Sequence, residues 1–276
     1  MLPESVVSSF GAHMTLKEKL AMCLSETHEA MNNAEDLFNS QVSLNGCEKS
    51  CTEAPPVWIL KPSTVNKGEG IKIMHCFEEV LDYCLETPDI REWVIQRYVS
   101  NPLLLRRRKF HIRAYALAVS AIQVYLYDQV LALCSGQKYS DNTSQTLAHI
   151  TNTAYQAIDP NFSEETCILL LDDMRRVLVK DGTCKNNADA IQVVNKILQD
   201  MRDITGELFC AYRGEFGVFA PLEGCFEHYG LDFLVDDKFN VFLLEVNPGP
   251  DFKQTGSRQK GVISGLMEAT IDVALT

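Results

Sequence analysis

Short apolar runs divide the chain into a series of predicted strands. Each run is bounded by glycine, proline or charged residues, and several of them alternate apolar with polar positions, as a half-buried strand does. The predicted strands are Val57–Leu60, Ile71–Met74, Trp93–Val99, Phe110–Val119, Val124–Tyr127, Gly230–Asp237 and Phe239–Pro250. A hairpin turn through Asp236-Asp237-Lys238 is expected to join the last two.

Apolar residues at helical spacing predict four helices between these strands. The clearest is Asn186–Phe209, where the spacing of the apolar residues forms a stripe that we expect to pack against the sheet bearing Asp232. The other predicted helices are Thr15–Phe38, Phe77–Leu85 and Val262–Leu275, and the polar stretch Ser40–Pro56 is expected to be a mobile loop. Strands and helices mixed without strict alternation favour an α+β architecture with largely antiparallel sheets.

Composition restricts the class of protein. The 276 residues are 46% hydrophobic, which is enough to bury a substantial core. The formal net charge of −12 argues against non-specific nucleic-acid binding and against an anionic membrane surface. No apolar run reaches the roughly 18 residues of a membrane span, so we expect a cytoplasmic protein whose cysteines are reduced thiols. The histidines form no HExxH motif, which disfavours a zinc hydrolase.

The two strands nearest the carboxyl terminus carry three candidate metal ligands. Asp232 interrupts an apolar run, and Glu245 and Asn247 are two residues apart, so they project from the same face of their strand. The hairpin would bring all three together. Carboxylate and amide oxygens are the ligands that Mg²⁺ takes, with water and nucleotide phosphate completing its octahedron. The alternative is that these acids are solvated residues of a half-exposed strand.

A possible phosphate-binding region lies nearer the amino terminus. Lys61 ends a buried strand, where its ammonium needs a counter-charge that a phosphate would supply. The following loop contains Lys67, Gly68 and Gly70, and its glycines would let backbone N–H groups approach phosphate oxygens. The alternatives are a lysine that extends to solvent and an ordinary glycine turn.

Three further segments are candidates for ligand contacts. The residues Gln96, Arg97, Tyr98 and Val99 could present backbone groups to an adenine edge. In the basic run that follows, Lys109, His111 and Arg113 share one face of a predicted strand, which suggests a polyanion or carboxylate ligand. That run could equally be an exposed edge strand protected by charge. Thr151 and Asn152 could contact a ligand or simply cap or turn the chain.

The order of these segments resembles that of the tubulin–tyrosine ligase family of the ATP-grasp superfamily. The resemblance covers nearly the whole chain, and it rests on the motifs Trp58-Ile-Leu-Lys-Pro62, Lys67-Gly-Glu-Gly-Ile71, Ile95-Gln-Arg-Tyr-Val99, Arg108-Lys-Phe-His-Ile-Arg113, Tyr125-Leu-Tyr127, His149-Ile-Thr-Asn152, Gly230-Leu-Asp-Phe and Leu244-Glu-Val-Asn247. Members of this family join an amino acid to a protein through an acyl-phosphate made from ATP. The resemblance implies two ATP-grasp lobes around the nucleotide, residues 1–98 and 99–276.

The resemblance also implies roles for the candidate residues. Lys61 and Lys109 would hold phosphates, with Lys67, Gly68, Gly70 and His111 beside them, and Gln96 to Val99 would frame the adenine. Thr151 and Asn152 would line the nucleotide and the acceptor. Asp232, Glu245 and Asn247 would bind Mg²⁺, and Arg113 would act in catalysis with Glu245 and Asn247 by stabilising the acyl-phosphate or the carboxylate of the incoming amino acid.

The chain departs from the family pattern in ways that concern the substrates. His111 stands where the family usually has an aspartate, and Ala132 is nearest to the position of an arginine that grips the amino acid. The family's small amino-terminal domain is expected to be absent or to lie upstream. A free amino acid and a protein acceptor are the implied substrates. Tubulin is one candidate acceptor, although its acidic tail would be repelled by a net charge of −12.

Two other functions would explain the same motifs. A catalytically weakened member could bind nucleotide and serve as an interaction module, as His111 and Ala132 suggest. An ATP-grasp ligase that acts on a small-molecule carboxylate would equally retain Lys61, Asp232, Glu245 and Asn247.

Overall fold

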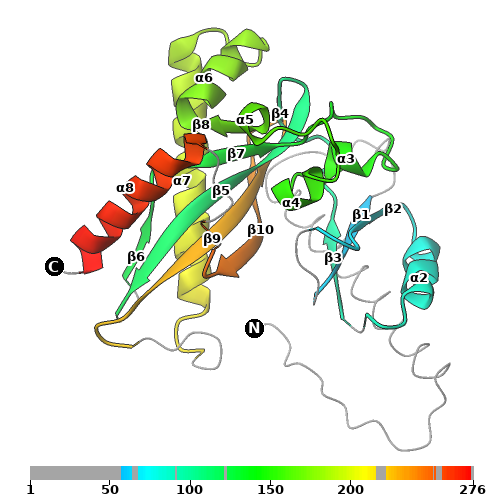
Figure 1. Ribbon diagram of the computed structural model, residues 1–276, viewed down its shortest axis with the longest axis horizontal. Coiled ribbons are helices and arrows are strands. Elements are labelled where there is room, and N and C mark those ends of the chain that lie inside the picture. Colours follow the sequence, from blue (N-terminus) through cyan, green and yellow to red (C-terminus); the bar gives the residue numbers. More distant parts are fainter. Residues whose placement is uncertain are drawn as a thin grey trace, which may run out of the picture. The chain divides into compact units, whose positions relative to one another are not determined.

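The computed structural model describes residues 57–63, 68–90, 92–120, 123–215, 222–250, 252 and 257–274 (Figure 1). These residues form two compact units. The first contains residues 57–63 and 70–98, and the second contains Gly68, Glu69 and the described residues from Val99 onward. The predicted helix Thr15–Phe38 and the predicted loop Ser40–Pro56 lie outside the described residues.

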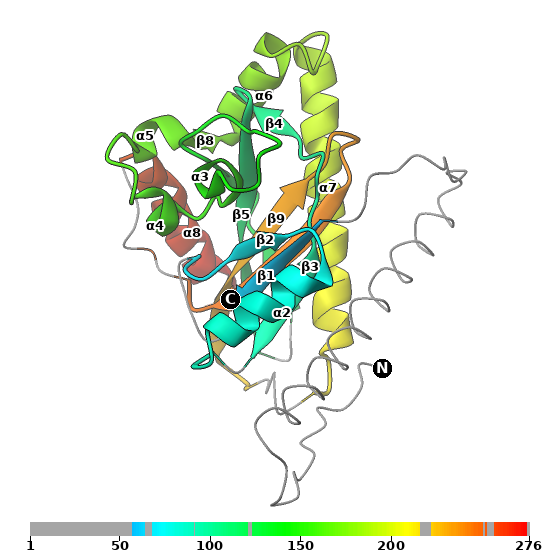
Figure 2. The same ribbon diagram turned by 90° about the vertical axis from the view of Figure 1, so that its right-hand side faces the viewer.

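The first unit is a three-stranded antiparallel sheet with one helix. Its strand order is β2-β1-β3, and the elements are β1 (Trp58–Pro62), β2 (Lys72–Met74), α2 (Phe77–Glu86) and β3 (Trp93–Arg97). Trp58 and Leu60 alternate toward one face, where they pack with Met74 and with Val80 of α2 (Figure 2). Lys61 therefore belongs to the other face of this sheet.

The second unit is organised around a sheet of seven strands. Five of them follow the order β10-β9-β5-β7-β8, and β4 and β6 also pair with β5. The strands are β4 (Leu104–Leu105), β5 (Arg108–Val119), β6 (Gln123–Leu126), β7 (Leu131–Cys134), β8 (Ile168–Leu170), β9 (Phe226–Val235) and β10 (Val241–Pro248). All pairings are antiparallel. The twelve-residue β5 has neighbours on both sides, so it lies in the interior of the sheet.

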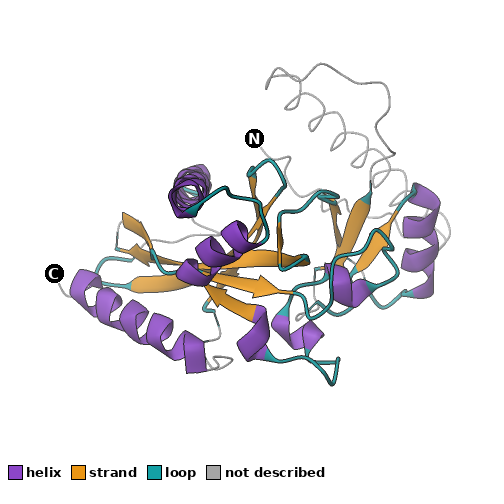
Figure 3. Cartoon of the chain, turned by 90° about the horizontal axis from the view of Figure 1, so that it is seen from above, coloured by secondary structure: helices purple, strands orange, loops and turns teal. Residues whose placement is uncertain are grey.

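Helices cover both faces of this sheet. On one face α6 (Leu171–Lys180) and α7 (Asn187–Ala211) pack through residues such as Met174 and Ile197 against Phe110 and Phe233. On the other face Val262 and Leu266 of α8 (Ser257–Ala274) pack on Leu131 (Figures 1 and 3). Three one-turn helices complete the unit: α3 (Thr146–His149), α4 (Thr153–Gln156) and α5 (Glu164–Cys167).

The predicted architecture is confirmed: the α+β class, the antiparallel sheets and the packing of α7 on the sheet that bears Asp232 agree with the sequence-based expectations. The two-residue β4, the one-turn helices α3, α4 and α5, and the elements β7, β8 and α6 were not predicted. A four-residue apolar run such as β7 carries no readable period, and α6 follows β8 without a turn. Among the described residues, no helix is both long enough and apolar enough to cross a membrane.

Candidate functional site

The hairpin of β9 and β10 brings the three predicted metal ligands together. Glu245 lies directly opposite Asp232, and Asn247 lies opposite Gly230. This register depends on an irregularity between Leu243 and Glu245, where β10 carries one residue more than β9. A regular ladder continued from Leu243 and Phe233 would place Leu244 opposite Asp232. The bulge therefore puts Glu245 on the same face as Asp232.

Asp232 is held by two side chains of the neighbouring strand β5. Arg113 donates two hydrogen bonds to it, from Nε to Oδ1 and from Nη2 to Oδ2, the second at 2.9 Å. Nε2 of His111 lies 3.8 Å from Oδ1 of the same carboxylate. On its other side, Nδ1 of His111 is 2.6 Å from the hydroxyl of Thr151. Four predicted site residues thus form one chain of polar contacts: Thr151, His111, Asp232 and Arg113.

These side chains are buried although they carry charge. Lys109, His111 and Asp232 are 6%, 5% and 5% exposed. An exposed edge strand protected by charge is therefore the wrong interpretation of the basic run, since β5 is an interior strand. Burial alone would lower the pKa of Arg113, but the hydrogen bonds and the negative charge of Asp232, with smaller contributions from Tyr115 and Glu245, raise it above its usual value. Arg113 is a permanent cation in this site.

Gly230 makes room for Arg113, and the sequence analysis missed its importance. A Cβ atom at Gly230 would lie 3.0 Å from Cβ of Pro250 and 3.5 Å from Nη1 of Arg113. The contact with Pro250 would be tighter than ordinary packing, and the contact with Arg113 would be an ordinary van der Waals contact. A glycine inside an otherwise apolar strand is the sequence signal for such a close approach. Gly230 therefore leaves the space that Pro250 occupies next to Arg113.

Asn152 has a structural role in the folded chain. Its side chain caps α4 by accepting hydrogen bonds from the backbone N–H groups of Ala154 and Tyr155. The capping alternative therefore holds for Asn152, whereas Thr151 faces His111. Gly68 lies against this segment: its φ is +78°, and a Cβ there would meet Ile150 at 3.2 Å and Asn152 at 3.6 Å. Only a glycine fits this position without strain.

The remaining predicted nucleotide contacts lie in the first unit. Lys61 pairs with Val94 and Ile59 pairs with Gln96, so Lys61 and Gln96 belong to the sheet face opposite Trp58 and Leu60. Arg97 pairs with Trp58, and Tyr98, the last residue of this unit, is 6% exposed. Gly70 has a φ of +71° next to Pro62. Lys67 lies outside the described residues, and Val99 belongs to the second unit.

The structure shows which way the residues of β7 face, including Ala132, which stands nearest to the family arginine in the sequence. Ala132 pairs with Ile112 and lies in the core under α6 and α7, so it faces away from Arg113. The residues of β7 on the site face are Leu131, opposite Arg113, and Leu133, opposite His111. A side chain that reaches the site from β7 must come from an odd-numbered position, because strand residues alternate between faces. Leu133, not Ala132, is therefore the apolar residue beside the charged chain.

The donor set suits a magnesium ion. Asp232 and Glu245 supply carboxylates and Asn247 supplies an amide, and all three are oxygen ligands of the kind that Mg²⁺ prefers. Nδ2 of Asn247 donates to Oε1 of Glu245 at 3.1 Å, which orients the amide. Within the described residues, the amide oxygen of Asn247 and Oε2 of Glu245 accept no hydrogen bond. Each oxygen of Asp232 keeps a second lone pair beside its bond to Arg113.

Comparison with known proteins identifies the family to which the chain is similar. The model of the tubulin-tyrosine ligase family matches residues 9–276. A probable tubulin–tyrosine ligase of Schizosaccharomyces pombe is 30% identical over 309 residues, covering 100% of this chain and 69% of the relative. The probable tubulin–tyrosine ligase PBY1 of Saccharomyces cerevisiae is 30% identical over 263 residues, but this chain spans only 33% of its length.

A solved structure shows the fold. The carboxyl-terminal domain of Pby1 from K. lactis, described as an ATP-grasp enzyme that interacts with the mRNA decapping enzyme Dcp2, superposes with a TM-score of 0.59 at 28% identity. The match covers 94% of this chain and 62% of that domain. The fold is therefore the ATP-grasp fold predicted from the motifs. On the family model and on the relative from S. pombe, the chain belongs to the tubulin–tyrosine ligase family.

Proposed function

We propose that this chain is an ATP-dependent ligase that adds an amino acid to a protein through an acyl-phosphate intermediate. The observation that carries the proposal is the register of β9 and β10, which sets Glu245 opposite Asp232 and beside Asn247. This is the arrangement of oxygen ligands that a magnesium–nucleotide complex requires. The partly buried cation Arg113 beside them supplies the positive charge that phosphoryl transfer needs.

In the proposed reaction, an acceptor carboxylate oxygen attacks the γ-phosphorus of ATP and the bond to the β-phosphate oxygen breaks, releasing ADP. The amine of the amino acid then attacks the acyl carbon, inorganic phosphate leaves, and the amine loses a proton to form the amide. Mg²⁺, held by Asp232, Glu245 and Asn247, would neutralise charge on the phosphates when bound. Arg113 is fixed by Asp232, so its charge is in place before the substrate arrives.

His111 and Thr151 position this arrangement. The short contact between Nδ1 of His111 and the Thr151 hydroxyl orients the ring so that Nε2 faces Asp232. An aspartate at position 111 would instead place a second carboxylate against Asp232 and raise the electrostatic cost of the site. We therefore propose that His111 keeps Asp232 and Arg113 in register and that it does not bind the metal.

The protein acceptor is proposed from the relatives. Two of them are named as probable tubulin–tyrosine ligases, and the solved relative interacts with a decapping enzyme. A net charge of −12 disfavours approach to the acidic tail of tubulin unless the basic side chains face it. We propose a cytoplasmic protein acceptor, of which tubulin is one candidate, together with a free amino acid.

A weakened ligase that serves as an interaction module is the second candidate. Leu131 and Leu133 give the site face of β7 no charge with which to grip an amino-acid carboxylate. In that case the chain would bind ATP without transferring an amino acid.

The test is incorporation of labelled amino acids. The purified chain is incubated with ATP, Mg²⁺, candidate acceptor proteins and each labelled amino acid in turn, with Arg113→Met as the inactive control. We expect ATP-dependent label in protein, lost in the variant. Nucleotide binding without any labelled product would favour the interaction module, and label found only in small molecules would indicate a ligase for small-molecule carboxylates.

A further inference from the structure

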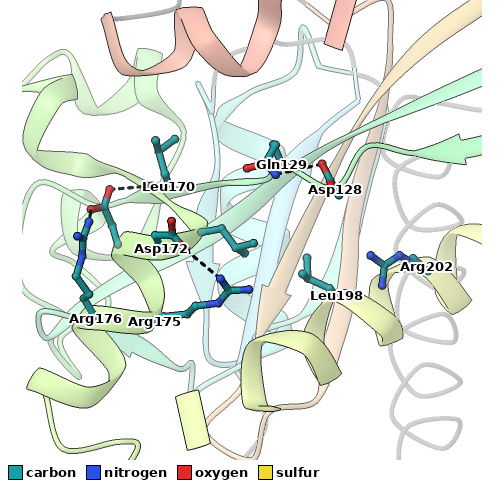
Figure 4. A pocket seen from close by; sticks show the side chains of 10 residues that line it. Asp128, Gln129, Leu170, Asp172, Arg175, Arg176, Leu198 and Arg202 are labelled. Atoms are coloured by element: carbon teal, nitrogen blue, oxygen red, sulfur yellow. Dashed lines mark hydrogen bonds and ion pairs between the residues drawn. The ribbon is translucent and has the colours of Figure 1, made fainter. Parts of the chain in front are cut away.

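A pocket in the second unit is lined by none of the residues assigned above. Its volume is about 490 Å³, and it is formed by the start of α6, the middle of α7 and the loop between β6 and β7 (Figure 4). Leu170, Leu171 and Leu198 provide apolar surface, and Arg175, Arg202 and Asp128 provide charge. A cavity of this size is typical of sites for small molecules.

This pocket is separate from the predicted metal-site residues of the same unit. Leu198 and Leu171 belong to the core between the sheet and the helices α6 and α7. Arg113 and Asp232 project from the other face of the sheet, since their neighbours Ile112 and Phe233 point into that same core. A ligand in this pocket therefore does not occupy the proposed ligase site.

The cationic groups of the pocket have unused hydrogen-bond donors. Nη1 of Arg175 donates to Asp172 at 2.9 Å, but its Nε is buried and donates to no other described residue. Arg202 is exposed and makes no hydrogen bond or ion pair with any residue that the structure describes. In Figure 4, Arg175 extends from α6 toward Leu198, and Arg202 enters from the α7 side. A buried donor without an acceptor is costly, and a carboxylate would relieve that cost.

The anionic group of the pocket is similarly available. Asp128 accepts one hydrogen bond, at 3.2 Å, from the neutral side-chain amide of Gln129. No described cation neutralises it. The other charged lining residues form two ion pairs, Arg175 with Asp172 and Arg176 with Asp173. Beside the leucines, the pocket therefore presents one carboxylate, Asp128, and one guanidinium, Arg202, that no described residue neutralises, together with the remaining donors of Arg175.

We propose that this pocket binds a small zwitterion, namely a free α-amino acid with an aliphatic side chain. Its carboxylate contacts Arg175 and Arg202, its ammonium contacts Asp128, and its side chain rests on the leucines. A phosphate or another plain anion would be repelled by Asp128 and Asp172, and a plain cation would be repelled by the arginines. Only a ligand that carries both a carboxylate and an ammonium group can contact the arginines and Asp128 at the same time.

The experiment is a calorimetric titration of the full chain with L-leucine in the absence of ATP. Leucinamide, which lacks the carboxylate, and N-acetyl-leucine, which lacks the ammonium, are titrated in parallel, and methyl NMR follows Leu170, Leu171 and Leu198. We expect saturable binding of leucine with shifts at those methyl groups. We also expect binding to be roughly tenfold weaker for each analogue and for Arg202→Ala or Asp128→Asn, because each loses one charge-assisted contact.

Two controls separate this proposal from the proposed ligase function. Arg213→Ala removes an exposed arginine outside the pocket, and Glu245→Ala disables the predicted metal site. Both should leave leucine binding unchanged. The proposal is overturned if leucine does not bind, if N-acetyl-leucine binds as tightly as leucine, if inorganic phosphate competes, or if Arg202→Ala has no effect. An unaltered chain that binds leucine but shows no ligase activity would contradict only the proposed function.

Discussion

The two faces of strand β5 are both largely buried but chemically opposite. Phe110, Ile112 and Ala114 on one face are at most 1% exposed and pack under α6 and α7. Lys109 and His111 on the other face are at most 6% exposed, yet they carry polar and charged groups, as does their neighbour Arg113. Because one strand builds both faces, the difference between them lies only in the side chains.

The apolar face serves mainly stability, and the polar face serves mainly function. The apolar face stabilises the fold by removing hydrocarbon surface from water. The polar face can be buried only because its charges are paired, and a buried ion pair contributes little net stability. The side chains of the polar face are better explained by a functional role, because they fix the cation of Arg113 beside the three predicted oxygen ligands.

The largest expected effect comes from the apolar face. Phe233→Ala should lower the free energy of unfolding by about 3 to 5 kcal/mol, because Phe233 is fully buried and the cavity would not refill. Phe233→Leu is the matched control and should cost about 1 kcal/mol. Urea unfolding measures both. A cost for Phe233→Ala no larger than that of the leucine variant would show that this face is loosely packed.

The ion pair of the polar face should behave differently from a packed side chain. Asp232→Leu alone should cost about 3 kcal/mol, because it leaves Arg113 partly buried without its partner. The double variant Asp232→Leu with Arg113→Met should recover most of that loss, since no unpaired charge remains. The free energies of unfolding of the unaltered chain, of Asp232→Leu, of Arg113→Met and of the double variant form a double-mutant cycle. Additive losses would mean that Asp232 and Arg113 are not energetically coupled, which would contradict this account of the ion pair.

Gly230→Ala should show whether a packing change on β9 also affects the function of Arg113. The added Cβ would press on Cβ of Pro250 and contact the side chain of Arg113, and we expect the free energy of unfolding to fall by about 1 to 2 kcal/mol. The stability loss should be accompanied by weaker nucleotide binding, because relief of the contact with Pro250 would disturb the neighbouring side chain of Arg113. Gly206→Ala is a control at a position with open space around its Cβ. Unchanged nucleotide affinity in Gly230→Ala would separate Arg113 from the nucleotide.

Acid should weaken the turn that presents Thr151. Burial and, to a smaller extent, the charge of Lys109 lower the pKa of His149 below 6.5, although its hydrogen bond to the Asn142 carbonyl opposes this. The neutral form is therefore favoured in the folded protein, and its contribution is complete above pH 6.5 and lost as the pH falls toward the folded pKa. His228, which is partly buried and also has a pKa lowered by burial, adds to the same trend.

The measurement compares unfolding midpoints at about pH 7.5 and about pH 5.5. The midpoint should fall with acidification in the unaltered chain and should fall less in His149→Gln. An equal fall in both would assign the pH dependence to other groups.

Part of this site could be predicted from the sequence because strand alternation is a local rule. It correctly placed Glu245 and Asn247 on one face, and Lys109, His111 and Arg113 on one face of β5. Local rules could not show the bulge at Leu244, the interior position of β5 or the face of Ala132, since each depends on how separate strands pair. The role of Gly230 also depends on a side chain from another strand.

The central claim is that Asp232, Glu245 and Asn247 hold a magnesium–nucleotide complex, and thermal unfolding tests it most directly. The melting temperature is measured with ATP and Mg²⁺, with ATP and a chelator, and without ligand, for the unaltered chain, for Glu245→Ala and for Glu207→Ala as an acid outside the site. The account predicts a rise only with ATP and Mg²⁺ together, abolished by Glu245→Ala and kept in Glu207→Ala. An unaltered chain whose melting temperature does not respond to ATP and Mg²⁺ would contradict it.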